Sequence, residues 1–88
     1  MAIDTTEHTL TTTATRVTPD TYDSIQVEFL NGQPAEFAVT ETTTAPSDDD
    51  FIRVNSDLNT ILVDTGHYWL RRSSAAIAPP EIKVIAFT

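Results

Sequence analysis

The sequence predicts an all-β fold: a small antiparallel β-sandwich or jelly-roll-like barrel of six to seven short strands. No stretch repeats its apolar residues at the 3.6-residue spacing of an amphipathic helix. Instead, short alternating runs of apolar and polar residues recur about every ten residues, a spacing typical of sandwiches and small barrels. Threonine is abundant, and its β-branched side chain suits an extended, half-exposed strand.

The clearest strand is Ser24–Asn31, in which Ile25, Val27 and Phe29 share one face. Asn31-Gly32 follows, and both residues tolerate the positive φ of a tight hairpin turn. Five further strands are expected after turns and loops rich in Asp, Ser, Gly and Pro. They are Ala35–Thr42, Phe51–Asn55, Thr60–Asp64, His67–Arg72 and Glu81–Phe87. We expect the sandwich domain to cover residues 22–88.

Residues 1–21 form a threonine-rich N-terminal arm, which we expect to be extended. Its stretch 7–17 is a candidate seventh strand, although only Leu10, Ala14 and Val17 are apolar there. With so few large apolar side chains, the arm is either a free tail or a segment that pairs with the sheet edge of a neighbouring copy.

Several strands are apolar on both faces, which a two-layer sandwich of one chain does not hide. An 88-residue chain also forms a small core, and without cysteines it has no disulfide to reinforce it. A second copy is the simplest cover, so we expect a homo-oligomer, with a trimer as the expected form. The candidate interface residues are Ile61, Val63, Trp69, Ile85 and Phe87.

The net charge of −8, with 13 acidic residues against 5 Lys and Arg, disfavours some partners. Nucleic acid and anionic membrane surfaces would repel such a chain. The N-terminus also lacks the basic and apolar regions of a signal peptide. We expect no cofactor and no metal site.

The polar clusters have ordinary structural explanations. Asp48–Asp50 offers oxygens for calcium but lacks the spacing of a helix-loop-helix site, so a solvated loop is expected. Arg71-Arg72 offers a phosphate site, but pairing with local carboxylates, Asp64 or Glu81 among them, is the favoured interpretation. A triad of Asp64, His67 and Ser73 or Ser74 lacks the strained nucleophile turn. We therefore expect no catalytic residues and no enzyme.

The adjacent aromatic residues Tyr68 and Trp69 support an alternative function. Aromatic faces stack on the apolar faces of sugars, so these two rings are a candidate platform for a carbohydrate-binding or tail-fibre module. A tryptophan in the middle of a strand is more often a core or interface anchor. Trp69 and Leu70 are expected on opposite faces of their strand.

The stretch Ser24–Thr88 resembles small structural proteins of bacteriophage virions. The resemblance rests on the first strand with Asn31-Gly32, then TETTTAP (Thr40–Pro46), DTGHYWLRRSS (Asp64–Ser74) and the terminal strand IKVIAFT (Ile82–Thr88). It implies a capsid decoration or cement protein, or another head or tail component. Its partners would be its own copies and the major capsid or another virion protein. It would be made in the host cytoplasm and would reside on the capsid surface.

Overall fold

The structure, a computed structural model, describes residues 3–54, 60–63 and 66–88. It confirms the all-β fold class, and all six strands expected after Tyr22 are present. The strands are β1 (Ile3–Thr9), β2 (Thr15–Arg16), β3 (Ser24–Phe29), β4 (Ala35–Thr40), β5 (Ile52–Val54), β6 (Thr60–Val63), β7 (His67–Arg72) and β8 (Glu81–Phe87). A short 3-10 helix, η1 (Asp48–Asp50), precedes β5.

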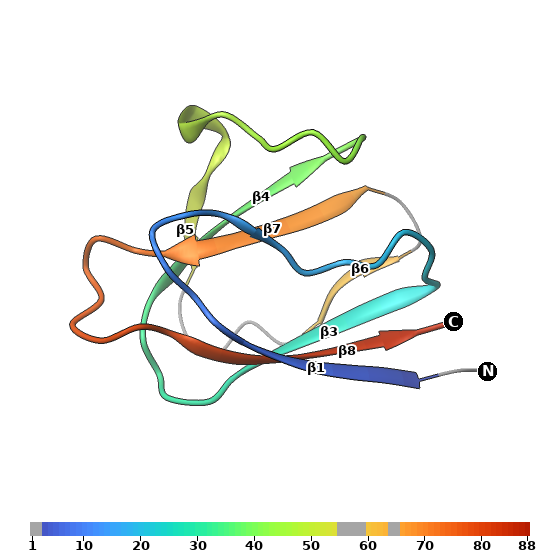
Figure 1. Ribbon diagram of the computed structural model, residues 1–88, viewed down its shortest axis with the longest axis horizontal. Coiled ribbons are helices and arrows are strands. Elements are labelled where there is room, and N and C mark those ends of the chain that lie inside the picture. Colours follow the sequence, from blue (N-terminus) through green and yellow to red (C-terminus); the bar gives the residue numbers. More distant parts are fainter. Residues whose placement is uncertain (1–2, 55–59, 64–65) are drawn as a thin grey trace.

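The strands form two four-stranded antiparallel sheets that stack face to face (Figure 1). Sheet A has the order β1-β8-β3-β6, and sheet B has the order β2-β7-β4-β5. Among consecutive strands of the described residues, only β4 and β5 are neighbours in one sheet; the others alternate between the sheets. This is the strand order of an eight-stranded jelly roll, so the structure is a sandwich with jelly-roll topology.

The turn at Asn31-Gly32 does not form the expected hairpin, because β3 and β4 lie in different sheets. Gly32 does adopt a positive φ of 71°. The Asn31 side chain ties this connection to the one before β8: its Nδ2 donates to the Pro79 carbonyl at 2.9 Å, and its Oδ1 accepts from the Glu81 N–H at 3.1 Å. The turn therefore forms an arch between the sheets.

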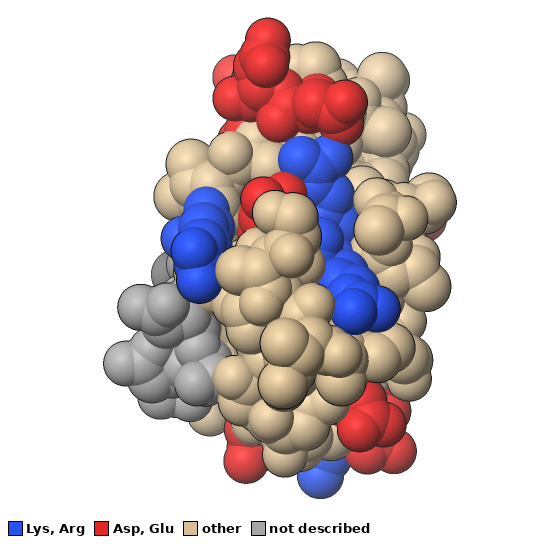
Figure 2. Space-filling view, turned by 90° about the vertical axis from the view of Figure 1, so that its left-hand side faces the viewer, with Lys and Arg blue, Asp and Glu red and all other residues tan. Residues whose placement is uncertain are grey.

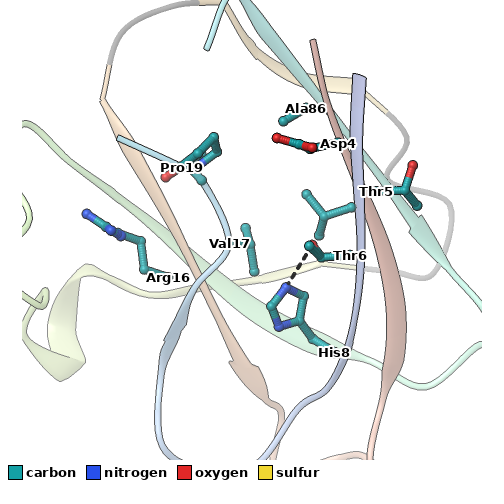
Figure 3. A pocket seen from close by; sticks show the side chains of 10 residues that line it. Asp4, Thr5, Thr6, His8, Arg16, Val17, Pro19 and Ala86 are labelled. Atoms are coloured by element: carbon teal, nitrogen blue, oxygen red, sulfur yellow. Dashed lines mark hydrogen bonds between the residues drawn. The ribbon is translucent and has the colours of Figure 1, made fainter. Parts of the chain in front are cut away.

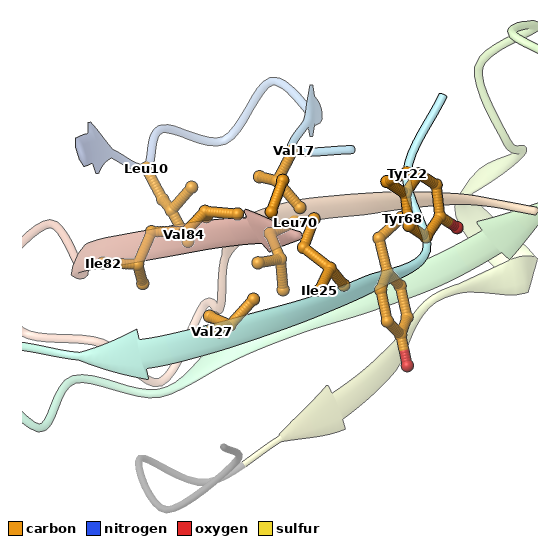
Figure 4. Close-up of a cluster of buried hydrophobic side chains, with 11 residues drawn as sticks. Leu10, Val17, Tyr22, Ile25, Val27, Tyr68, Leu70, Ile82 and Val84 are labelled. Carbon is orange, nitrogen blue, oxygen red and sulfur yellow. The ribbon is translucent and has the colours of Figure 1, made fainter. Parts of the chain in front are cut away.

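The core lies between the two sheets and draws side chains from both (Figure 4). Alternating residues of β8 and β3 point inward, so Ile82, Val84, Ile25 and Val27 are at most 2% exposed. Sheet B contributes Leu70, which has no exposed surface. The remaining members are Leu10, Val17, Tyr22, Ala35, Tyr68 and Ala86.

The N-terminal arm is part of the sandwich. β1 pairs with β8 of its own chain over all seven residues, and β2 pairs with β7. Leu10 and Val17, two of its few apolar side chains, are buried in the core. The arm is therefore no free tail within this chain, and its pairing with the sheet edge of a neighbouring copy stays a prediction. Main-chain hydrogen bonds hold the arm, so it needs few apolar side chains.

Candidate interaction surfaces

The outer face of sheet A carries two of the predicted interface residues. Ile85 and Phe87 are half-buried, and they lie on β8 between β1 and β3. Ile3, which is 59% exposed, stands opposite Phe87 in the register, so both side chains belong to the same face. Ile3, Ile85 and Phe87 form an apolar strip, here called the sheet A strip. Its partial exposure leaves it available to a partner.

Trp69, the third predicted interface residue, is buried within the chain. It points outward from sheet B, opposite to Leu70 as expected, yet only 9% of it is exposed. Its Nε1–H donates to the Thr40 hydroxyl at 2.9 Å. Tyr68 points into the core, is 6% exposed and packs edge-on against Phe37 with ring centroids 5.4 Å apart. The two rings therefore present no exposed platform for a sugar.

The connection 41–51 lies over the outer face of sheet B (Figure 1). Two of its residues contact Arg71: the Asp48 carboxylate at 2.7 Å from Nη1, and the Phe51 ring, whose centroid is 3.9 Å from the guanidinium carbon. Arg71 also pairs with Glu36 on β4, at 2.7 Å between Nε and Oε1. The hydrogen bonds that Arg71 donates to Glu36 and then to Asp48 raise its pKa above the already high ordinary value of an arginine.

These contacts revise the expected partners of the arginine pair. Arg71 pairs with Glu36 and Asp48, neither of which was singled out for it. Arg72 donates from Nη2 to the Ala76 carbonyl at 3.1 Å. The rest of the acidic loop is exposed, as expected for a solvated loop, and the Ser47 N–H donates to the Asp50 carboxylate at 3.2 Å.

Three positions of the sequence analysis fall outside the description: the side chains of Ile61 and Val63, and Asp64 altogether. Of the remaining triad candidates, His67 opens β7 and Ser73 follows its last residue. Six residue steps along an extended strand place their Cα atoms about 20 Å apart. That distance keeps the two side chains from acting on one substrate atom.

One end of the sandwich is free of charged side chains in its described connections. Residues 10–14, 30–34 and 73–80 contain no Asp, Glu, Lys or Arg. They meet at the end opposite to the chain termini (Figure 1), which is here called the loop end. Figure 2 views this end directly: uncharged side chains cover much of it, basic side chains extend into its middle, and most of the acidic ones lie toward its upper and lower margins.

Ile77 is the most exposed large apolar residue of the described chain, at 89%, and it belongs to the loop end. Its loop is held by several hydrogen bonds. The Ile77 N–H donates to Gln33 Oε1 at 3.1 Å, and the Ala76 N–H donates to the Ser73 carbonyl at 3.0 Å. Residues 73–80 are one of the loops expected between the strands, and none of their side chains was predicted as a site residue. The available signal was an isoleucine within a long uncharged loop, SSAAIAPP.

A groove of about 290 Å³ opens along the side of the sandwich, between β1 and the segment from Arg16 at the end of β2 to Pro19 (Figure 3). Asp4, Thr6 and His8 line it from β1, and Arg16 lies across from them. The floor is apolar, made by Val17, Val84 and Ala86. His8 Nε2 and the Thr6 hydroxyl are 3.2 Å apart. Inward-facing residues of β1 are thus polar, because water reaches this open side.

Comparison of the chain with protein families, with curated proteins and with solved structures finds no match. Within the described residues, no helix is long and apolar enough to cross a membrane. Nor do three or more His, Cys, Asp or Glu side chains of that part of the chain gather into a group able to hold a metal ion.

Proposed function

We propose that this protein is a non-enzymatic structural component of a phage virion that binds the capsid surface as a decoration or cement protein and assembles as a homo-oligomer. The loop end carries the proposal. Interface cores are depleted of charge and enriched in large apolar side chains. Ile77 is 89% exposed and lies in a loop, residues 73–80, that contains no charged residue, with the Arg72 side chain as a charged neighbour.

The hydrogen bonds that hold the Ile77 loop add to this argument. A loop that is already ordered loses little conformational entropy when it binds, so more of the contact energy contributes to affinity. Gln33, Asn31 and Arg72 each donate or accept a hydrogen bond that fixes the loop to neighbouring elements. The loop end is therefore ordered before it binds a partner.

The sheet A strip supports self-assembly or a second contact with the shell. Ile3, Ile85 and Phe87 lie on one face, and burial of such side chains contributes about 25 cal/mol per Å² of apolar surface. The jelly-roll order is also common among capsid domains, a likeness of architecture that supports the proposal by analogy alone. Sugar binding by Tyr68 and Trp69 is not proposed, since both rings are buried.

The test is co-sedimentation with purified phage particles from the source of this chain, stripped of the protein itself. We expect the unaltered protein to sediment with the particles and Ile77→Ser to lose most of this binding. Val39→Ser is the matched control, because Val39 is also an exposed apolar residue, at 47%, but outside the loop end. Failure of the unaltered protein to bind would overturn the function. Equal binding by Ile77→Ser would overturn the role of the loop end.

A further inference from the structure

β1 is a long strand with a neighbour on one side only. It pairs with β8 over all seven residues of Ile3–Thr9 without a break in register, and no described strand lies beyond it. An edge of this length offers a row of main-chain donors and acceptors to any strand that approaches it. β1 also has no proline, no glycine and no lysine to prevent such pairing. The edge is therefore suited to strand addition.

The register with β8 shows which residues offer these groups. The Leu10 N–H donates to the Pro80 carbonyl at 2.8 Å, one step beyond the Thr9–Glu81 pair. Hydrogen-bonded pairs alternate along an antiparallel ladder, so residues 4, 6 and 8 also direct their main-chain groups toward β8. Residues 3, 5, 7 and 9 direct theirs outward, to the free edge.

The segment is complementary to itself when two copies run antiparallel with Thr6 opposite Thr6. In that register Ile3 faces Thr9, Asp4 faces His8 and Thr5 faces Glu7. The outward-directed residues then face one another, so the main-chain hydrogen bonds form in both directions. Neighbouring registers of the same phase pair fewer residues, and one of them places Glu7 opposite Glu7, which is repulsive.

The facing side chains also match in chemistry. Asp4, Thr6 and His8 all line the groove of Figure 3, so they share one face of β1. Directly opposite residues lie within about 5.5 Å between Cβ atoms, and an imidazole N–H donates well to a carboxylate. Two such Asp4–His8 contacts would form, one on each side of the symmetry axis. No acidic side chain faces another, although the chain has a charge of −8.

We propose that two copies of this chain pair through the free edges of β1, antiparallel and with Thr6 at the two-fold axis, to form one continuous eight-stranded sheet. The proposal rests on the homo-oligomer part of the proposed function and replaces the expected trimer by a two-fold dimer as the basic unit. It commits to a second copy as the occupant because the seven-residue segment pairs with itself over its whole length.

Disulfide trapping tests the register, and the chain has no cysteine of its own to interfere. Residue 6 directs its main-chain groups toward β8, so the two position-6 residues form a non-hydrogen-bonded pair across the interface. The Cα atoms of such a pair are about 4.5 Å apart, within disulfide range. Position 5 of one copy is opposite position 7 of the other, so the two position-5 Cα atoms are offset by two residues along the strands and lie about 8.5 Å apart, beyond that range. Thr6→Cys and Thr5→Cys are therefore matched: adjacent, equally exposed threonines with opposite expectations.

Under mild oxidation of the full chain, we expect Thr6→Cys to become mostly a disulfide-linked dimer on a non-reducing gel. Thr5→Cys should give at least about tenfold less at the same concentration. Equal yields from both variants, or no dimer from Thr6→Cys, would overturn the proposal. Circular dichroism of both variants, oxidised and reduced, ensures that the compared proteins are folded.

Thr5→Pro is an independent second variant. It removes an N–H that points to the free edge and takes no part in the ladder with β8, and proline is tolerated at such edges. We expect a folded protein whose dimer is lost in sedimentation velocity, while an unchanged dimer would contradict the proposal. Neither readout uses phage particles. A monomer that still binds particles would overturn the pairing alone, and a dimer that does not bind them would overturn the capsid function alone.

Discussion

Apolar side chains on the outer faces of the two sheets are shielded from water to different extents. Both carry apolar side chains that the space between the sheets does not bury. On sheet B, the connection 41–51 covers them, and Ala38 and Trp69 are 2% and 9% exposed. On sheet A, Ile85 and Phe87 remain half-buried and Ile3 is 59% exposed. An apolar outer face therefore does not by itself indicate a subunit interface, because a long connection of the same chain also covers it.

The largest expected effect comes from removing the covered tryptophan. Trp69→Ala leaves a cavity beneath connection 41–51 and should lower the free energy of unfolding by about 3–5 kcal/mol. Urea denaturation followed by circular dichroism measures it. A loss below about 1 kcal/mol, typical of a surface substitution, would show that the connection does not shield this side chain from water.

The hydrogen bond that anchors the indole should have the next largest effect. Thr40→Val removes the acceptor of the Trp69 Nε1–H and leaves that donor buried, at a cost of about 1–3 kcal/mol. Thr42→Val is the control, because Thr42 is exposed and its substitution should change stability by less than about 0.5 kcal/mol. Equal effects of the two variants would contradict the role assigned to this bond. The measurement is again urea denaturation.

Phe87 tests the open face in the same comparison. Phe87→Ser should change the stability of the isolated chain by only about 1 kcal/mol, because the side chain is half-buried. It should nevertheless weaken any assembly that uses the sheet A strip, measured by sedimentation velocity and by particle binding. If Phe87→Ser lowers the free energy of unfolding as much as Trp69→Ala does, the outer face of sheet A is shielded from water as well as that of sheet B.

The smallest effect at neutral pH is expected at Tyr68, on the inner side of sheet B. Burial, and then the neighbouring Tyr22, raise the pKa of Tyr68 above its ordinary value of 10.0. A raised pKa in the folded state means that the neutral phenol is stabilised. This contribution is complete below about pH 10 and is lost as the pH rises through the folded-state pKa.

Tyr68→Phe should therefore flatten the loss of stability between about pH 9 and pH 11, with little change near pH 7. Thermal unfolding across this range measures the difference between the two proteins. Identical alkaline profiles would show that other groups cause the loss.

The sequence by itself determined where the strands are. Alternation of apolar and polar residues located all six strands after Tyr22, and five of them, β3, β4, β6, β7 and β8, begin at the expected residue. The same alternation identified the inward face of β3, where Ile25 and Val27 are buried. These features are local: the period of a strand and the turn residues at its ends are contained within about ten residues.

Only the tertiary structure decided which sheet each strand joins and which apolar faces are covered. Asn31-Gly32 became an arch because its side chain bonds to Pro79 and Glu81, about fifty residues away, a contact that no local pattern specifies. The arm likewise joined the sandwich through main-chain bonds to β8, which depend little on side-chain identity. The cover over Trp69 and the free edge of β1 follow from the same long-range pairing. The alternation of apolar and polar residues indicates a strand that must pair with other strands. Only the packing of the whole chain determines which strands those are.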